Sequence, residues 1–232
     1  MNYSLAKDGF EIVEGILDAP SIESLRRAVD ELPQRHRVGA RNLLSDSEAV
    51  AELAAASSVK RLADAALGKG SLPVRALLFD KVPDANWKVP WHQDTAIAVA
   101  RRVDVDGFFG WSMKDGVPHV HPPSSVLEHM VTLRVHLDDC GPENGPLRVL
   151  PGSHVQGTLS DGQIQDWRQA ASEFSCCCVA GDVLVMKPLL LHASSLAVSP
   201  SRRRVIHLEY ASVRLPVGLR WFVERGEDAQ VD

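Results

Sequence analysis

Two side chains that bind metals stand two residues apart in the sequence WHQD at residues 91–94. Successive side chains of a strand point to opposite faces, so an extended backbone here puts His92 and Asp94 on the same face. Another histidine, His192, follows the apolar run at residues 189–191. Two histidines and one carboxylate on one side of a metal ion leave its other side open, as in the facial triad of non-haem Fe(II) oxygenases. The sequence therefore predicts that these residues form a metal site.

Further stretches accompany these residues. The segment ENGPLRVLPGSH occupies residues 143–154, GDVLVMKPLLLHASS occupies residues 181–195, and Arg203 lies eleven residues after the distal histidine. Together with WHQD, they resemble the phytanoyl-CoA dioxygenase family of Fe(II)- and 2-oxoglutarate-dependent oxygenases. The resemblance covers residues 77–210, and LAKDGF at residues 5–10 is similar to the start of that family.

The resemblance implies an oxygenase that uses Fe(II), 2-oxoglutarate and O2. In that family the metal, here held by His92, Asp94 and His192, binds the C1 carboxylate and keto oxygen of 2-oxoglutarate. The co-substrate is converted to succinate and CO2 while a C–H bond of the substrate is hydroxylated. Aspartate at position 94 disfavours halogenation, because the related halogenating enzymes carry a small residue there.

The far carboxylate of 2-oxoglutarate needs a cation at some distance from the metal. We expect Arg203 to bind it, because a guanidinium presents a planar fork that matches a carboxylate. Ser194 can add a hydroxyl to the same carboxylate, whereas Arg202 and Arg204 would face the other way on a strand, towards solvent. Arg134 lies on the polar face of another predicted strand. It could bind the C1 carboxylate, an acidic group of the substrate, or a structural acidic partner.

The substrate pocket has candidates of several chemical types, namely Trp87, Trp111, Lys81, Gln93 and His119. Leu77 is expected to line the 2-oxoglutarate pocket by packing alone. Residues 101–123 combine glycines, prolines and aromatics, and irregular stretches of this length inside domains are commonly lids or binding loops. We therefore predict a substrate-gating lid here, and the polar candidates favour a polar or acid-bearing substrate.

The composition is that of an ordinary globular protein, with 232 residues of which 45% are hydrophobic and 24% charged. A net charge of −5 disfavours nucleic acid and anionic membranes as partners, because both attract a basic face. Residues 1–15 lack the pattern of a secretory signal, and no apolar run is long enough to cross a bilayer. Cys140 and the triplet at residues 176–178 have neither zinc-site nor disulfide spacing. We expect a cytoplasmic protein with a small-molecule substrate.

Residues 1–70 are predicted to be helical. Helices are expected at residues 46–56 and 58–67, the latter ending at Gly68. A preceding helix is indicated by apolar residues spaced three or four apart, which are Ile22, Leu25, Val29 and Leu32. We expect these helices to form a layer on the outside of a sheet.

Residues 71–232 change to a hydrophobic period of two. At residues 130–137 apolar and polar side chains alternate, which predicts a strand with one face on a hydrophobic layer and one towards a polar cavity. Many short strands with Gly and Pro turns favour an antiparallel sandwich. The family resemblance specifies an all-β jelly roll, which is a cupin-like double-stranded β-helix. We expect one oxygenase domain over residues 1–232.

Two other functions remain open from the sequence. A zinc hydrolase could use the same metal ligands, with metal-bound water as the nucleophile. Arg203 disfavours it, because a hydrolase has no use for a dedicated dicarboxylate clamp. A non-catalytic jelly roll could instead bind a sugar or a small acid, but a complete set of metal ligands disfavours that alternative.

Overall fold

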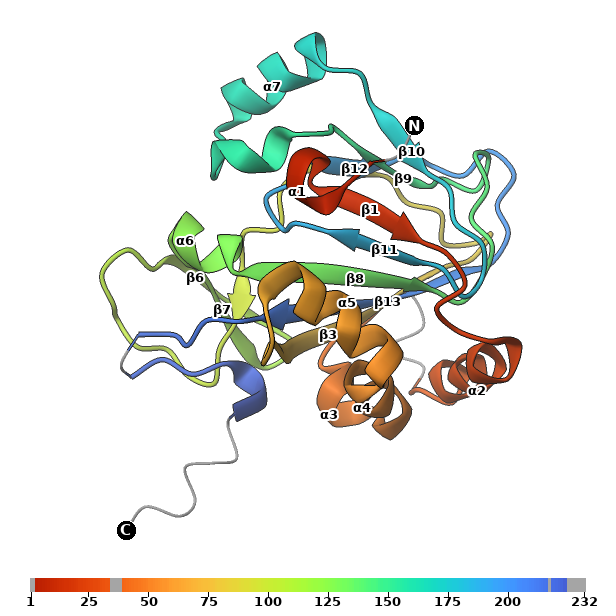
Figure 1. Cartoon of the computed structure of the whole chain (residues 1–232), viewed down its shortest axis with the longest axis horizontal. Coiled ribbons are helices and arrows are strands. Elements are labelled where there is room, and N and C mark those ends of the chain that lie inside the picture. The colour runs from red at the N-terminus through yellow and green to blue at the C-terminus, as the bar shows by residue number, and fades with distance from the viewer. Residues whose placement is uncertain (1–2, 34–38, 217, 225–232) are drawn as a thin grey trace.

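The computed structural model describes residues 3–33, 39–216 and 218–224. Its strands pair antiparallel in three sheets within these residues. The major sheet has the order β1 (Phe10–Val13), β11 (Val183–Met186), β8 (Met130–His136), β13 (Arg203–Ala211), β3 (Leu72–Lys81) and β2 (Gly39–Ala40). The minor sheet has the order β10 (Phe174–Cys176), β9 (Leu147–Val149), β12 (His192–Ser194) and β4 (Val89–His92). The two form the predicted jelly roll (Figure 1).

The predicted helices are present and cover the outside of the major sheet. Figure 1 shows α3, α4 and α5 on one side of the major sheet, where α3 and α4 contact β3 and α5 contacts β8. The helices are α1 (Leu5–Asp8), α2 (Ala19–Asp30), α3 (Leu43–Asp46), α4 (Glu48–Ala55), α5 (Ser57–Leu67), α6 (Ser124–Glu128) and α7 (Asp161–Ala170). Gly68 follows α5 with φ +91°, a conformation that glycine adopts without strain. These helices therefore lie outside the sheet, as the hydrophobic periodicity of the sequence indicated.

The prediction that residues 1–70 are wholly helical is wrong at β1 and β2, which join the major sheet. The backbone of β1 pairs with β11, with Phe10 opposite Met186. The Phe10 ring is buried and packs near Tyr3 and Phe174, with ring centroids 4.7 and 5.5 Å away. Pairing with a sheet edge and burial of this ring therefore override the helical tendency of the surrounding residues.

Alternation along the strands of the major sheet separates an apolar outer face from a polar inner face. Leu133, Val135, Ile206 and Leu208 belong to the same buried cluster as side chains of α4 and α5. The hydroxyl of Tyr210 donates to the carbonyl of Ala54 at 2.8 Å and ties β13 to α4. The predicted alternation at residues 130–137 is thus observed, and the opposite, polar face looks into the jelly roll.

Residues 101–123 are not irregular throughout, which corrects the sequence prediction. A third sheet, with the order β5 (Ile97–Ala98), β7 (Val117–His121) and β6 (Phe109–Lys114), includes a hairpin from this stretch. Asp115 and Gly116 form its two-residue turn with φ +49° and +76°. An Asp-Gly pair with positive φ at both positions is a strong hairpin signal, and the signal was present in the sequence.

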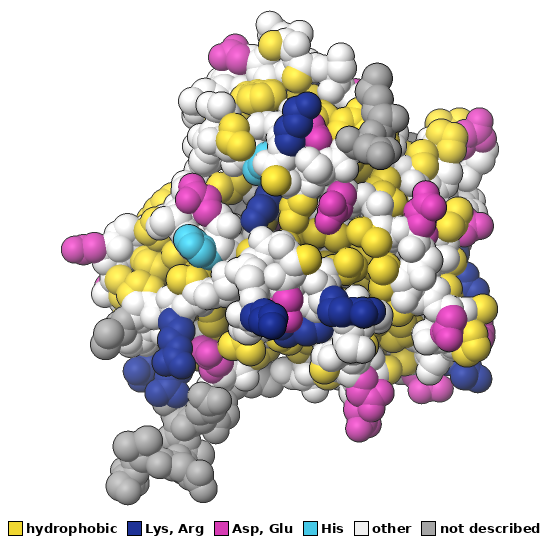
Figure 2. Space-filling model, viewed as in Figure 1, with side chains coloured by type: hydrophobic (Ala, Val, Ile, Leu, Met, Phe, Trp, Pro, Cys, Tyr) yellow, Lys and Arg dark blue, Asp and Glu magenta, His cyan; other side chains and the backbone are white. Residues whose placement is uncertain are grey.

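The surface seen in Figure 2 mixes basic and acidic side chains. Lys and Arg stand beside Asp and Glu on this face rather than in one block of a single sign. No helix within the described residues is both long and apolar enough to cross a membrane.

Candidate metal centre

The three predicted metal ligands converge on one point at the open side of the jelly roll. Strand β12 pairs with β4 so that His192 lies opposite His92, and Asp94 follows two residues later. One ligand atom from each residue lies within 4.8 Å of the others. The Asp94 carboxylate sits between the two rings, with Oδ1 3.7 Å from the Nε2 of His92 and Oδ2 3.6 Å from the Nε2 of His192.

Backbone carbonyls fix the orientation of both imidazoles. The Nδ1 of His92 donates to the carbonyl of Pro90 at 2.8 Å, and the Nδ1 of His192 donates to the carbonyl of Leu190 at 2.9 Å. A carbonyl only accepts, so each ring carries its proton on Nδ1 and turns a free Nε2 lone pair towards Asp94. Carbonyl or carboxylate partners on the far nitrogen are the usual way in which proteins orient metal-binding histidines.

The residues present fit a divalent metal ion. The Oδ2 atom of Asp94 is buried without a hydrogen-bond partner among the described residues, and a metal would supply the missing contact. Burial raises the pKa of Asp94, but three neighbouring histidines and Arg75 lower it to about 2, so the carboxylate is ionised. Burial lowers the pKa of His192 to about 4, which keeps the ring neutral. A neutral imidazole and an ionised carboxylate are the forms that bind metals.

A cavity of about 100 Å³ adjoins the metal ligands. Arg203 and Lys81 also line this cavity, and they lie opposite each other on β13 and β3. The Nζ of Lys81 is 3.4 Å from the hydroxyl of Ser194 and 5.1 Å from the centroid of the Trp87 ring, and both residues line the cavity. Lys81, a substrate candidate in the sequence, thus lies beside the predicted carboxylate anchor.

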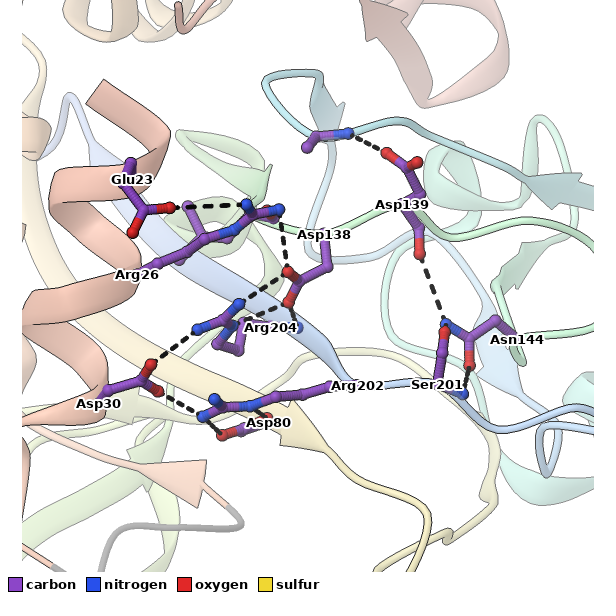
Figure 3. Close-up of polar contacts among 12 residues, drawn as sticks. Glu23, Arg26, Asp30, Asp80, Asp138, Asp139, Asn144, Ser201, Arg202 and Arg204 are labelled. Atoms are coloured by element: carbon purple, nitrogen blue, oxygen red, sulfur yellow. Dashed lines mark hydrogen bonds and ion pairs between the residues drawn. The ribbon is translucent and has the colours of Figure 1, made fainter. Parts of the chain in front are cut away.

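Acidic partners hold the neighbours of Arg203 on the opposite face (Figure 3). Arg202 pairs with Asp30 and Asp80 at 2.6 and 2.7 Å, and Arg204 pairs with Asp30 and Asp138 at 3.1 and 2.8 Å. The expectation that both face solvent is wrong for Arg204, which these pairs bury, whereas Arg202 is exposed. Because acidic residues hold Arg202 and Arg204 on the outer face, Arg203 is the arginine of these three whose guanidinium faces inward.

Arg134 lines the same cavity and has no acidic partner among the described residues. Its Nη1 donates to the Nδ1 of His207 at 3.0 Å, and its guanidinium carbon lies 5.2 Å from the centroid of the Phe79 ring. Burial and the charge of Arg203 lower the pKa of Arg134 to about 10, so it remains a cation. A buried cation without an acidic partner indicates that a ligand provides the anion.

Four sequence candidates do not line the cavity, namely Gln93, Leu77, Trp111 and His119. The Gln93 side chain points away from the metal ligands on either side of it, as strand alternation requires. Its amide donates to the carbonyls of Leu189 and Gly157 at 2.6 and 2.9 Å, and it accepts from the backbone of Leu159 at 2.8 Å. It therefore braces the chain around the site. Leu77 is buried on the inner face opposite His207.

The remaining candidates lie on the β6–β7 hairpin. Trp111 packs against the apolar cluster behind the third sheet, and the guanidinium carbon of Arg102 is 5.5 Å from its ring centroid. His119 is buried, and its Nδ1 donates to the carbonyl of Val117 at 2.9 Å. The hairpin is held beside the metal ligands, because His121 on β7 contacts Thr95, the residue after Asp94, at 3.0 Å.

The jelly roll and its His/Asp/His site define a metal-binding protein of the facial-triad class. The family model described as phytanoyl-CoA dioxygenase (PhyH) matches residues 5–205. The chain belongs to this family. The predicted resemblance is therefore confirmed.

A relative and several solved structures are similar to the chain. It is 28% identical over 150 residues to L-proline trans-4-hydroxylase from Streptomyces griseoviridis, covering 53% of the chain and 48% of that relative. AviO1 from Streptomyces viridochromogenes Tue57 superposes with a TM-score of 0.68 and 24% identity, covering 91% of this chain and 93% of AviO1. EctD from S. alaskensis with 2-oxoglutarate and 5-hydroxyectoine superposes with a TM-score of 0.69 and 20% identity, covering 90% of this chain and 74% of EctD. These structural similarities establish the shared fold.

Proposed function

We propose that the protein is an Fe(II)- and 2-oxoglutarate-dependent dioxygenase that hydroxylates a small polar or acid-bearing molecule. The observation that carries this proposal is the charge of the cavity beside the metal ligands. Three basic residues, Lys81, Arg134 and Arg203, line the cavity. The one acidic residue in its lining is Asp94, which is a predicted metal ligand. A buried space with excess cations and an adjoining metal fits a dicarboxylate that also coordinates the metal.

Each residue has a distinct role in this proposal. His92, Asp94 and His192 hold Fe(II), which when bound supplies the activation of O2 for attack on a C–H bond. Arg203, Lys81 and Ser194 bind the far carboxylate of 2-oxoglutarate, and Trp87 covers them. Arg134 lies between this anchor and His207 and orients the carboxylate nearer the metal.

The zinc-hydrolase alternative is disfavoured by the same cavity. A hydrolase requires a metal-bound water and room for a scissile bond. Several buried cations aimed at one small space beside the metal serve no step of that reaction. A purely ligand-binding jelly roll would not need both imidazoles held with their Nε2 atoms facing a carboxylate.

The direct test is 2-oxoglutarate turnover by the Fe(II)-loaded protein. We expect succinate formation that depends on Fe(II) and O2 and that rises when a substrate is added from a panel of polar metabolites. Zn(II)-loaded protein is the matched control and should form no succinate. Hydrolysis of an ester or amide by the Zn(II) form, with no succinate from the Fe(II) form, would contradict the proposal.

Binding of 2-oxoglutarate should weaken as the pH rises through about 8. Burial and the charge of Arg203 lower the pKa of Lys81 to about 8. The protonated amine binds the carboxylate, so above that pKa binding requires proton uptake, and the dissociation constant should rise up to about tenfold per pH unit. Equilibrium titration across this pH range measures the effect.

Lys81→Arg is the matched control for this pH dependence. Arginine stays charged throughout the range, so the variant should bind 2-oxoglutarate with nearly constant affinity. An equal pH dependence in both proteins would show that another group titrates.

We further propose that the β6–β7 hairpin is the lid predicted for residues 101–123. Its attachment to Thr95 through His121 places it beside the metal ligands. A lid that excludes water protects a reactive site.

We also retain the cytoplasm as the expected compartment, because the cysteines at 140 and 176–178 are all free thiols.

A further inference from the structure

A chain of side-chain contacts on the inner face of the major sheet begins near the metal ligands and ends in the cavity beside them. Arg75 on β3 lies opposite Glu209 on β13. His207, two residues earlier on β13, lies opposite Arg134 on β8, and both line the cavity. At the other end of the chain the Nη1 of Arg75 donates to the carbonyl of Ala96, two residues after the carboxylate ligand, at 3.3 Å.

Glu209 is a buried acceptor that two donors share. It is 5% exposed, and Arg75 contacts its Oε1 atom at 3.2 Å. The Nε2 of His207 contacts the same oxygen at 3.3 Å. The Arg75 cation balances the carboxylate, which is the condition under which a buried charge is tolerated. Besides joining two strands, the ion pair therefore holds one nitrogen of His207.

The hydrogen-bonding roles of its two neighbours fix the tautomer of His207. A guanidinium only donates, so the Nδ1 of His207, 3.0 Å from the Nη1 of Arg134, is an acceptor. A carboxylate only accepts, so the Nε2 carries the proton and donates it to Glu209. The opposite tautomer would set an N–H group against an N–H group of Arg134. The acceptor at Glu209 therefore selects the form of His207 that can bind Arg134.

Arg134 depends on His207 for its orientation. The hydrogen bond to His207 is the one that the Arg134 side chain makes within the described residues, and its Nε is buried there without a partner. The ring centroid of Phe79 lies 5.2 Å from the guanidinium carbon and 5.5 Å from the centroid of the His207 ring. This ring packs on both side chains but offers no hydrogen-bond acceptor, so His207 sets the direction of the Arg134 N–H groups.

We propose that Glu209 is a positioning residue for 2-oxoglutarate, which fixes His207 in the tautomer that holds Arg134 towards the carboxylate nearer the metal. Glu209 itself does not line the cavity, so it acts through two other side chains. This inference rests on the proposed oxygenase function, because that function supplies the ligand that Arg134 binds.

The alternative is a purely structural ion pair between Glu209 and Arg75. Removal of such a pair would lower the stability of the fold and leave the ligand affinity of the folded protein unchanged. The contacts of His207 favour the positioning role, because one ring nitrogen is directed to the pair and the other to Arg134. The two roles predict different results when the charge is removed but the acceptor is kept.

The test compares two double variants by equilibrium binding of 2-oxoglutarate to Ni(II)-loaded protein, which does not turn over. Arg75→Met/Glu209→Met removes the ion pair and the acceptor for His207, whereas Arg75→Met/Glu209→Gln removes the pair but keeps an amide oxygen. Neither variant leaves an unpaired buried charge, so both should fold. We expect the methionine variant to bind 2-oxoglutarate about tenfold or more weakly than the glutamine variant. Equal affinities in the two variants overturn the inference.

A third substitution tests whether the effect passes through Arg134. In an Arg134→Met background, the glutamine and methionine variants at position 209 should differ less than about twofold, because the guanidinium that Glu209 positions is absent. The full difference in this background would show that Glu209 acts by another route, and the inference would be wrong.

The tautomer of His207 can be measured in the unaltered protein. Nitrogen NMR of protein with isotopically labelled histidine, loaded with diamagnetic Zn(II), distinguishes a protonated from an unprotonated ring nitrogen. We expect the His207 signals, assigned by their loss in His207→Gln, to show the proton on Nε2. A proton on Nδ1 contradicts the inference, whether or not the variants fold.

These measurements separate the inference from the proposed function. If the wild-type protein binds Ni(II) and 2-oxoglutarate but the two double variants bind it equally, the oxygenase proposal stands and the positioning role is wrong. If the wild-type protein binds no 2-oxoglutarate, the proposed function fails and the inference falls with it.

Discussion

Replacing His192 with alanine is expected to abolish metal binding and 2-oxoglutarate turnover. The substitution leaves His92 and Asp94, which supply two of the three ligand atoms gathered at the site. Loss of a residue that merely orients a ligand reduces metal affinity by roughly 10–100-fold, and removal of a ligand itself should exceed this. Titration of the metal-free protein with Fe(II) under anaerobic conditions measures the loss directly.

His129→Ala is the matched control for this prediction. His129 is exposed, and its Nδ1 donates to the carbonyl of Ser125, away from the metal ligands. The control should bind Fe(II) as the wild-type protein does, and both variants should retain the wild-type circular dichroism. Wild-type turnover in His192→Ala would remove the central claim, because the metal would then be held elsewhere.

The metal ligands could be predicted because their signal is local. His92 and Asp94 are two residues apart on one chain segment, and strand alternation alone puts them on one face. Alternation also assigned Arg203, the first residue of β13, to the face opposite its neighbours Arg202 and Arg204. His192 is distant in the sequence and was predicted from the family pattern. In the structure it lies on β12, which pairs with β4.

Features that depend on distant partners were not predictable in the same way. Arg204 is buried because Asp30 and Asp138, which lie far from it in sequence, both reach it. The pairing of β1 with β11 likewise joins segments that lie far apart in the sequence. A sequence pattern identifies a face of an element, but it does not identify which residue the fold brings against that face.

Glu209 illustrates both cases. Alternation along β13 puts Glu209 on the same face as Arg203 and His207, so its inward direction could have been read from the sequence. Its pairing with Arg75 requires the register between β13 and β3.

Arg203→Ala is expected to weaken 2-oxoglutarate binding roughly thirty-fold or more. Truncating one partner of a buried, hydrogen-bonded charge pair costs about 2–5 kcal/mol, and about 1.4 kcal/mol corresponds to a factor of ten. The Nε of Arg203 is buried without a partner among the described residues, which leaves it available to a ligand. Isothermal titration of the Ni(II)-loaded variant with 2-oxoglutarate gives the affinity without turnover.

The neighbouring arginine supplies the control that makes this prediction specific. Arg202→Ala removes the pairs with Asp30 and Asp80 on the outer face, so it should lower the melting temperature while leaving 2-oxoglutarate affinity within about twofold. Arg203 also donates to the carbonyl of Gly145, so thermal unfolding of both variants is needed to separate lost anchoring from lost structure. Normal affinity in Arg203→Ala together with weak binding in Arg202→Ala would mean that the co-substrate approaches from the outer face, against the orientation that the ion pairs of Arg202 and Arg204 impose.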